Sequence, residues 1–188
     1  MLDEKTAKLI LFYAVDPVDI FWQGEVLRNG AVNTYQKIIK DSSYLKISDF
    51  PQIRNRAINV NVEYLKSEII AANAQFISSE DFDWPVSCQD LSAPPIGLII
   101  KGERKLLTQL SKSISIVGSR RPTNYGLSVA NQLATDASKQ EIVVISGGAY
   151  GIDSAAHQAT LMAGGKTLAI GAAMRNTGRL YAMDTSGH

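Results

Sequence analysis

Two short segments of this 188-residue sequence concentrate the residue types that bind phosphate groups. The first segment is Val117-Gly118-Ser119-Arg120-Arg121-Pro122-Thr123-Asn124-Tyr125-Gly126. Gly118 permits a sharp backbone turn, and Ser119 offers a hydroxyl group. Arg120 and Arg121 add fixed positive charge and forked donors that match phosphate oxygens. If a helix begins near Asn124, its free N–H groups face the same space, so this segment predicts an anion site.

The second segment contains three glycines within five residues and reads Ser146-Gly147-Gly148-Ala149-Tyr150-Gly151. Such a backbone forms a tight concave turn that presents N–H groups to an anion. Asp153 follows at the start of a predicted helix, where we expect it to cap that helix or to interact favourably with its dipole. The residues predicted to contact phosphate here are Ser146, Gly147, Gly148 and Gly151.

Neither segment matches a standard nucleotide-binding fingerprint, since G-x-G-x-x-G and G-x-x-x-x-G-K-[ST] are both absent. A single glycine-rich turn also occurs as an ordinary crossover turn in α/β proteins. Two such turns, one of them with paired arginines, favour a binding role.

These two segments lie between elements that alternate between strand and helix. Strands are predicted over 113–117, 142–145 and 167–170, and helices over 124–138 and 151–162. The run Ile142 to Ile145 is apolar and continuously β-branched, as expected of a strand covered on both faces. A β-α-β-α-β order predicts a parallel sheet with right-handed crossovers. In such sheets ligands bind beyond the carboxyl ends of the strands, where both segments should lie.

Lys166 is a further candidate for phosphate binding, but its place in the chain is different. It follows Gly164-Gly165 and directly precedes the strand predicted at 167–170. The topology therefore places Lys166 at the opposite edge of the sheet from the two glycine-containing segments.

The first third of the chain is predicted to be helical. Residues 3–40 have helical character with a break at Asn29-Gly30. Residues 52–72 predict one amphipathic helix, because one apolar stripe contains Ile58, Val62, Leu65 and Ile69. We therefore expect an α/β protein with a small helical N-terminal domain, residues 1–72, followed by a Rossmann-like parallel sheet, residues 73–188, that is incomplete at its C-terminus.

The charge distribution, the single cysteine and the lack of long apolar runs limit the classes of function that fit this sequence. Residues 1–100 contain nine Lys and Arg against thirteen Asp and Glu, whereas residues 101–188 contain ten against five. The basic second half suggests a polyanionic partner, although an excess of this size also arises by chance.

One cysteine, Cys88, excludes an intrachain disulfide. No apolar run is long enough to cross a bilayer, and the start of the chain lacks a secretory signal, so a cytoplasmic protein without a membrane partner is expected.

The sequence resembles the DprA/Smf family of DNA-processing proteins. The stretch from Ile116 to Gly126 is similar to the family signature VGSR-x-PT-x-YG, and the stretch from Val144 to His157 is similar to VSGxAxGID-x-xAH. Gly164 to Ile170 resembles the strand GGKTIAV. Upstream, Trp84 to Gly102 resembles the family's entry to the Rossmann-like domain. The resemblance covers roughly residues 75–171.

The resemblance implies a non-enzymatic, cytoplasmic protein that binds single-stranded DNA and loads the RecA recombinase in natural transformation and recombination. It implies dimerisation through the Rossmann-like domain. It places the anion pocket at Gly118, Ser119, Arg120, Ser146, Gly147, Gly148 and Gly151, and it assigns the family lysine to Lys166. No cofactor or metal is expected, because His157 and His188 lack partners at ligand spacing. A structural hydrogen-bonding role is expected for His157.

The sequence departs from the family pattern after Gly171. The family's GxGxDxxYP loop and RNR segment do not follow, so we expect a truncated or degenerate copy, or an expressed fragment. Two alternatives to DNA binding remain open. One is a nucleotide hydrolase of the lysine-decarboxylase-like type, which would need a PGGxGTxxE stretch that this chain lacks. The other is a non-functional remnant.

Overall fold

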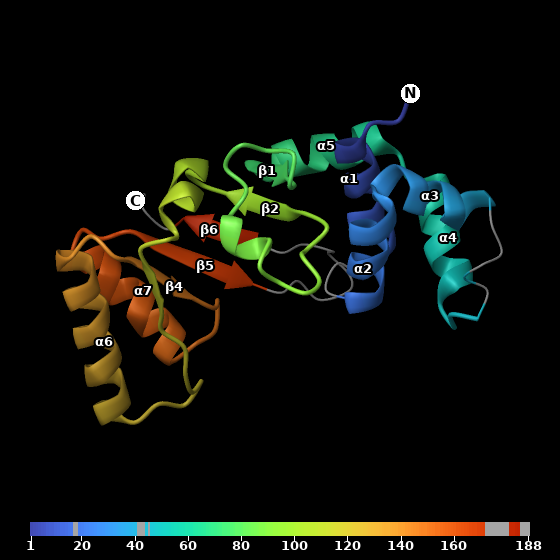
Figure 1. Cartoon of the computed structure of the whole chain (residues 1–188). Helices are drawn as coiled ribbons and strands as arrows, with labels where there is room; N and C mark the ends of the chain where they lie inside the picture. The colour runs from blue at the N-terminus through green and yellow to red at the C-terminus, as the bar shows by residue number, and fades with distance from the viewer. Residues whose placement is uncertain (17–18, 41–43, 45, 172–180, 185–188) are drawn as a thin grey trace. The chain divides into compact units, whose positions relative to one another are not determined.

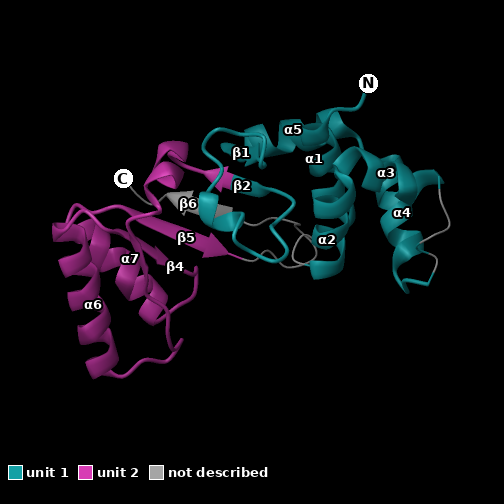
Figure 2. Ribbon diagram, viewed as in Figure 1, with its two compact units in different colours: residues 1–99, 174–179 teal, residues 100–173, 180–188 magenta. Residues whose placement is uncertain are grey.

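A computed structural model describes the chain except for residues 17–18, 41–43, 45, 172–180 and 185–188, and it describes only the backbone of 181–184. The described chain forms two compact units, one from residues 1–99 and one from residues 100–171 with 181–184 (Figure 2). The domain boundary at 72/73 stays a prediction, because compactness alone does not show where an independently folding domain ends. Within the described part of the chain, no helix combines the length and apolar character needed to cross a membrane.

The first unit is mainly helical, as predicted, and its described residues form five short helices before the first strand (Figure 1). The helices are α1 (Glu4–Ala14), α2 (Ile20–Asn29), α3 (Ala31–Lys40), α4 (Phe50–Asn59) and α5 (Val62–Ala71). They are followed by strand β1 (Ala74–Ile77) and the 3₁₀ turn η1 (Val86–Cys88). Strand β2 (Leu98–Lys101) continues into the second unit.

Side chains from distant segments satisfy several helix ends in the first unit. The Glu4 carboxylate accepts the Ala31 N–H at the start of α3, at 2.7 Å. Arg56 donates from Nε to the Ala14 carbonyl at the end of α1, also at 2.7 Å. The helix stop predicted at Asn29-Gly30 is confirmed, because α2 ends at Asn29 and Gly30 has φ 78°. These contacts fix the helices around a core that includes Trp22 and Phe50.

The prediction of one helix over 52–72 is wrong. The helix stops at Asn59 and restarts at Val62, because the Asn61 side chain accepts the Tyr64 N–H and caps a new helix. The predicted apolar stripe is not buried as one face, since Ile58 is 53% exposed.

The second unit contains the parallel sheet that the alternating pattern predicts. After the 3₁₀ segment η2 (Arg104–Gln109) come β3 (Ser113–Ser115), α6 (Asn124–Lys139), β4 (Val143–Ser146), α7 (Ile152–Met162) and β5 (Thr167–Gly171). β4 lies between β3 and β5 and pairs with both in parallel. A further strand, β6 (Tyr181–Asp184), pairs with β5 in the antiparallel direction. Strand β3 is shorter than predicted, since it ends at Ser115.

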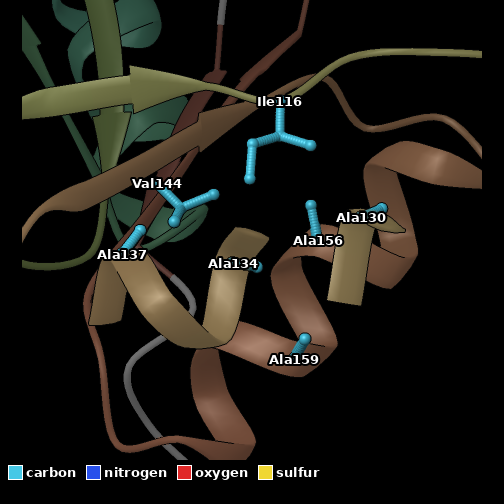
Figure 3. Close-up of a cluster of buried hydrophobic side chains, with 7 residues drawn as sticks. All are labelled: Ile116, Ala130, Ala134, Ala137, Val144, Ala156 and Ala159. Carbon is cyan, nitrogen blue, oxygen red and sulfur yellow. The ribbon is translucent and has the colours of Figure 1, made fainter. Parts of the chain in front are cut away.

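Because β3, β4 and β5 are neighbours in chain order, right-handed crossovers place α6 and α7 on the same face of the sheet. Figure 1 shows the two helices side by side. The helices face the sheet with small side chains. Ile116 and Val144, from the sheet side, belong to one buried cluster with five helix alanines: Ala130, Ala134, Ala137, Ala156 and Ala159 (Figure 3). Alanine side chains let the two helix backbones approach closely, which brings their N-terminal ends together.

Candidate nucleic-acid interface

Two connections leave the carboxyl edge of the parallel sheet and enter α6 and α7. We call residues 116–123, between β3 and α6, the first loop, and residues 147–151, between β4 and α7, the second loop. Since β3 and β4 are parallel neighbours, both loops begin at the same edge of the sheet. The structure thus brings together the two segments that the sequence singled out.

Direct backbone contact joins the two loops. The Ile152 N–H donates to the Ser119 carbonyl at 3.1 Å. Gly151 has φ 92°, and a Cβ atom there would lie 2.3 Å from the Ser119 carbonyl oxygen and 3.0 Å from two backbone atoms of Arg120. Only glycine fits such a conformation and approach. Gly151 is therefore a residue on which the geometry of both loops depends.

Gly118 is also required by close packing. A Cβ atom at Gly118 would lie 2.8 Å from a side-chain carbon of Ile152. Gly126, in the first turn of α6, approaches the same isoleucine, at 3.5 Å for an added Cβ. Ile152 thus fills the space between the starts of the two helices, a role that sequence analysis missed, because nothing in the sequence links positions 118 and 152.

Asp153 joins the loops rather than capping a helix. Of the two roles predicted for Asp153, capping is wrong, since Gly151 is the N-cap of α7 and that cap has no side-chain hydrogen bond. Asp153 is 7% exposed and accepts the Gly118 N–H through Oδ1 at 3.3 Å. Its other oxygen, Oδ2, would lie 2.6 Å from a Cβ atom at Gly147. The carboxylate lies in the first turn of α7, where the helix dipole favours negative charge.

His157 makes the structural hydrogen bonds that were expected of it. Its Nε2 lies 2.9 Å from the Gly147 carbonyl oxygen, and its Nδ1 lies 2.6 Å from Thr167 Oγ1. A carbonyl oxygen only accepts, so Nε2 carries the proton in the first bond. His157 therefore holds the start of the second loop against β5.

The predicted phosphate-binding residues fall into three groups in the structure. Gly118, Ser146, Gly147 and Gly151 build the base of the site. The Ser146 hydroxyl, in a residue 2% exposed, donates to the Ile116 carbonyl at 2.5 Å. Ser119, Arg120, Arg121 and Gly148 are predicted residues on the exposed part of the loops, and Gly118 is exposed too although it packs against Ile152.

Lys166 forms the third group, away from the loops. Its carbonyl accepts the Val144 N–H near the start of β4, so it lies at the amino edge of the sheet, as the topology predicted. Its Nζ donates to Gln109 Oε1 at 2.9 Å. The structure does not bring Lys166 together with the other predicted residues.

The exposed part of the site is electropositive and has free donors. Within the described part of the chain, neither the Arg120 nor the Arg121 guanidinium group forms an ion pair. The backbone N–H groups of Gly148, Ala149 and Tyr150 likewise have no hydrogen-bond partner among the described residues. Arginine side chains and consecutive free N–H groups suit a phosphate group at the surface.

The residues that the structure describes around the loops do not form a metal centre. Among the residues that the structure describes, no three His, Cys, Asp or Glu side chains are arranged around a metal position. Thr123 caps α6 by accepting the Gly126 N–H at 3.1 Å. The arrangement therefore offers anion contacts at the surface, above a base fixed by glycine packing and Asp153.

Comparison with known proteins shows to which family the chain belongs. The family model of DNA recombination-mediator protein A matches residues 75–181, more than half of the chain. The chain is 37% identical over 94 residues to the DNA processing protein DprA of Bacillus subtilis, which covers 50% of this chain and 31% of that protein. It is 30% identical over 130 residues to the DprA of Streptococcus pneumoniae, which covers 66% of this chain and 44% of that protein.

The fold agrees with this relationship. The X-ray structure of DNA processing protein A from Streptococcus pneumoniae superposes with a TM-score of 0.64 and 20% identity, and the match covers 97% of this chain and 69% of that one. This superposition supports a fold in which a helical region is followed by a Rossmann-like sheet. The chain spans 29% to 44% of the length of the curated relatives it matches. The chain belongs to the family of DNA recombination-mediator protein A, the DprA/Smf family.

Proposed function

We propose that this chain binds single-stranded DNA through the exposed residues of its two carboxyl-edge loops. One observation supports the proposal most strongly: Arg120 and Arg121 have no carboxylate partner among the described residues, and they share an edge of the sheet with three free N–H groups. Contacts of this kind hold phosphates without reading base sequence. Membership of a DNA-processing family supports DNA as the polyanion.

We also propose that the site is not catalytic. The carboxylate nearest to the loops, that of Asp153, is buried and accepts the Gly118 N–H. Both ring nitrogens of His157 are engaged in hydrogen bonds within the fold. Neither side chain is available to a substrate as a general acid or base. A release assay on nucleoside monophosphates tests this point, and steady turnover by the purified chain would contradict it.

The family supports three further proposals. The bound strand is passed to the RecA recombinase during transformation or recombination, the chain dimerises through its Rossmann-like unit, and it acts in the cytoplasm. Each has a direct assay: strand exchange by RecA with and without the chain, sedimentation of the chain alone, and fractionation of cells.

Binding to DNA is tested by fluorescence anisotropy with a labelled oligothymidylate. We expect Arg120→Ala to weaken binding by about five- to thirtyfold, since a charged hydrogen bond contributes about 1–2 kcal/mol at an exposed site. Lys139→Ala is the matched control. It removes the same charge from the far end of α6, about 24 Å along a 16-residue helix.

The control separates a local contact from general charge. Equal weakening by Arg120→Ala and Lys139→Ala would show that only net charge matters, and it would contradict the proposed site. Absence of binding by a chain that melts cooperatively would favour the remnant that sequence analysis left open.

A further inference from the structure

Two tyrosines belong to the segments that form the proposed DNA site, and both are largely exposed. Tyr125, in the first turn of α6, is 80% exposed, and Tyr150, in the second loop, is 87% exposed. Tyrosine rings usually bury most of their apolar surface. None of the ring contacts among the described residues involves either side chain. Both rings are therefore free to stack on a ligand.

Contacts of the neighbouring glycines place the backbones of the two tyrosines near the starts of α6 and α7. Tyr150 directly precedes Gly151, which packs against the backbone of Arg120. Tyr125 directly precedes Gly126, which lies next to Ile152, the residue that follows Gly151. Each tyrosine thus adjoins a glycine that lies close to the junction of the first loop with the start of α7. The arginines belong to the first loop and therefore to the same edge of the sheet.

We propose that Tyr125 and Tyr150 stack on nucleobases of the strand whose phosphates contact Arg120 and Arg121. The inference rests on the proposed function and adds a means of selecting unpaired DNA. A base can stack on a protein ring only when it no longer stacks on the adjacent bases. An unpaired strand allows this change, whereas a duplex resists it. Every base has a π-face, so such stacking tolerates any sequence.

The test separates base contacts from phosphate contacts by changing the ligand. Two labelled oligonucleotides of equal length are compared, an oligothymidylate and an abasic strand that carries the same phosphates without bases. We expect the unsubstituted chain to bind the oligothymidylate more tightly. Tyr150→Ala and Tyr125→Ala should each weaken that binding about tenfold, equivalent to about 1.4 kcal/mol, and leave abasic binding unchanged.

Two control variants accompany these substitutions. Tyr150→Phe keeps the ring and should stay within about twofold of the unsubstituted chain. Tyr64→Ala removes an exposed tyrosine from α5, in the other unit, and should change neither affinity. Arg120→Ala should weaken binding of both oligonucleotides to the same extent.

Several results would overturn the inference. One is equal affinity of the unsubstituted chain for the two strands, and another is equal loss of both affinities in the tyrosine variants. If these results came with salt-sensitive binding that Arg120→Ala weakens, the proposed function would stand and the stacking role would fail. Binding to neither strand would overturn both.

Discussion

The substitution Gly151→Ala tests most sharply whether backbone contact between the two loops shapes the site. Gly151 has φ 92° and ψ −125°, a conformation that side-chain-bearing residues rarely adopt. The added methyl group would lie 2.3 Å from the Ser119 carbonyl oxygen. The first atoms that it meets belong to the backbone, so no side-chain rotation relieves the clash.

The loss of stability in Gly151→Ala follows from two destabilising contributions and one that offsets them. Backbone strain at such a position costs about 1–3 kcal/mol, and overpacking costs about 1–3 kcal/mol more. The reduced flexibility of the unfolded chain offsets about 0.4–1 kcal/mol. We expect Gly151→Ala to lower the free energy of unfolding by about 1–5.5 kcal/mol. For a chain of this length, the melting temperature should fall by roughly 2–20 °C.

Gly148→Ala is the matched control, because it adds the same methyl group to the same loop. An added Cβ atom at Gly148 meets no atom within 4 Å. Urea denaturation of both variants gives the comparison, and Gly148→Ala should lie within about 0.5 kcal/mol of the unsubstituted chain or be slightly more stable. If Gly151→Ala changed stability no more than Gly148→Ala, the loops would not be in the described contact.

Two further predictions concern carboxylates, the buried Asp153 and the partly buried Glu25. Asp153→Ala should destabilise the chain by about 1–3 kcal/mol in urea denaturation, because it leaves the Gly118 N–H without its acceptor; an unchanged midpoint would show that the bond does not stabilise the loops. Burial raises the pKa of Glu25, but hydrogen bonds from Tyr44 and Arg28 outweigh this effect and lower that pKa below its usual 4.5. Stability from this group is therefore present above pH 4.5 and lost as the pH falls through the lowered pKa. Glu25→Gln should flatten the acid side of a melting-temperature profile, and an equally steep profile would contradict this assignment.

Much of the second unit could be predicted from the sequence because its elements have unambiguous patterns. The run of β-branched residues before Ser146 indicates a strand covered on both faces, and β4 is found at Val143–Ser146. The small residues between Asn124 and Ser138 indicate a helix that packs closely, and α6 is found at Asn124–Lys139. In both cases local propensity and tertiary packing favour the same structure.

The helix boundary at Asn61 was missed because two local signals compete there. An apolar stripe at helical spacing continues through the position, while the asparagine favours a new helix start. The asparagine prevails in the structure, since its side chain caps α5. The position of Ile58 in the stripe alone does not show that its side chain stays exposed.

The site could be predicted only in part, for a related reason. The sequence shows which residues follow each strand, so it brings the two loops to one edge. It does not show which of those residues point into the fold. Asp153 and Gly118 are 35 positions apart, and their hydrogen bond exists only because α6 and α7 begin side by side. The same packing turns the predicted capping residue into a link between the loops.

The salt dependence of oligothymidylate binding tests the central claim most directly. Removing one protein–phosphate interaction with a single strand should reduce the slope of log affinity against log salt by about 0.7. Arg120→Ala should therefore lower affinity at low salt and flatten this slope by about that amount, whereas Lys139→Ala should leave the slope unchanged. A slope that Arg120→Ala does not alter would contradict phosphate binding at the two loops.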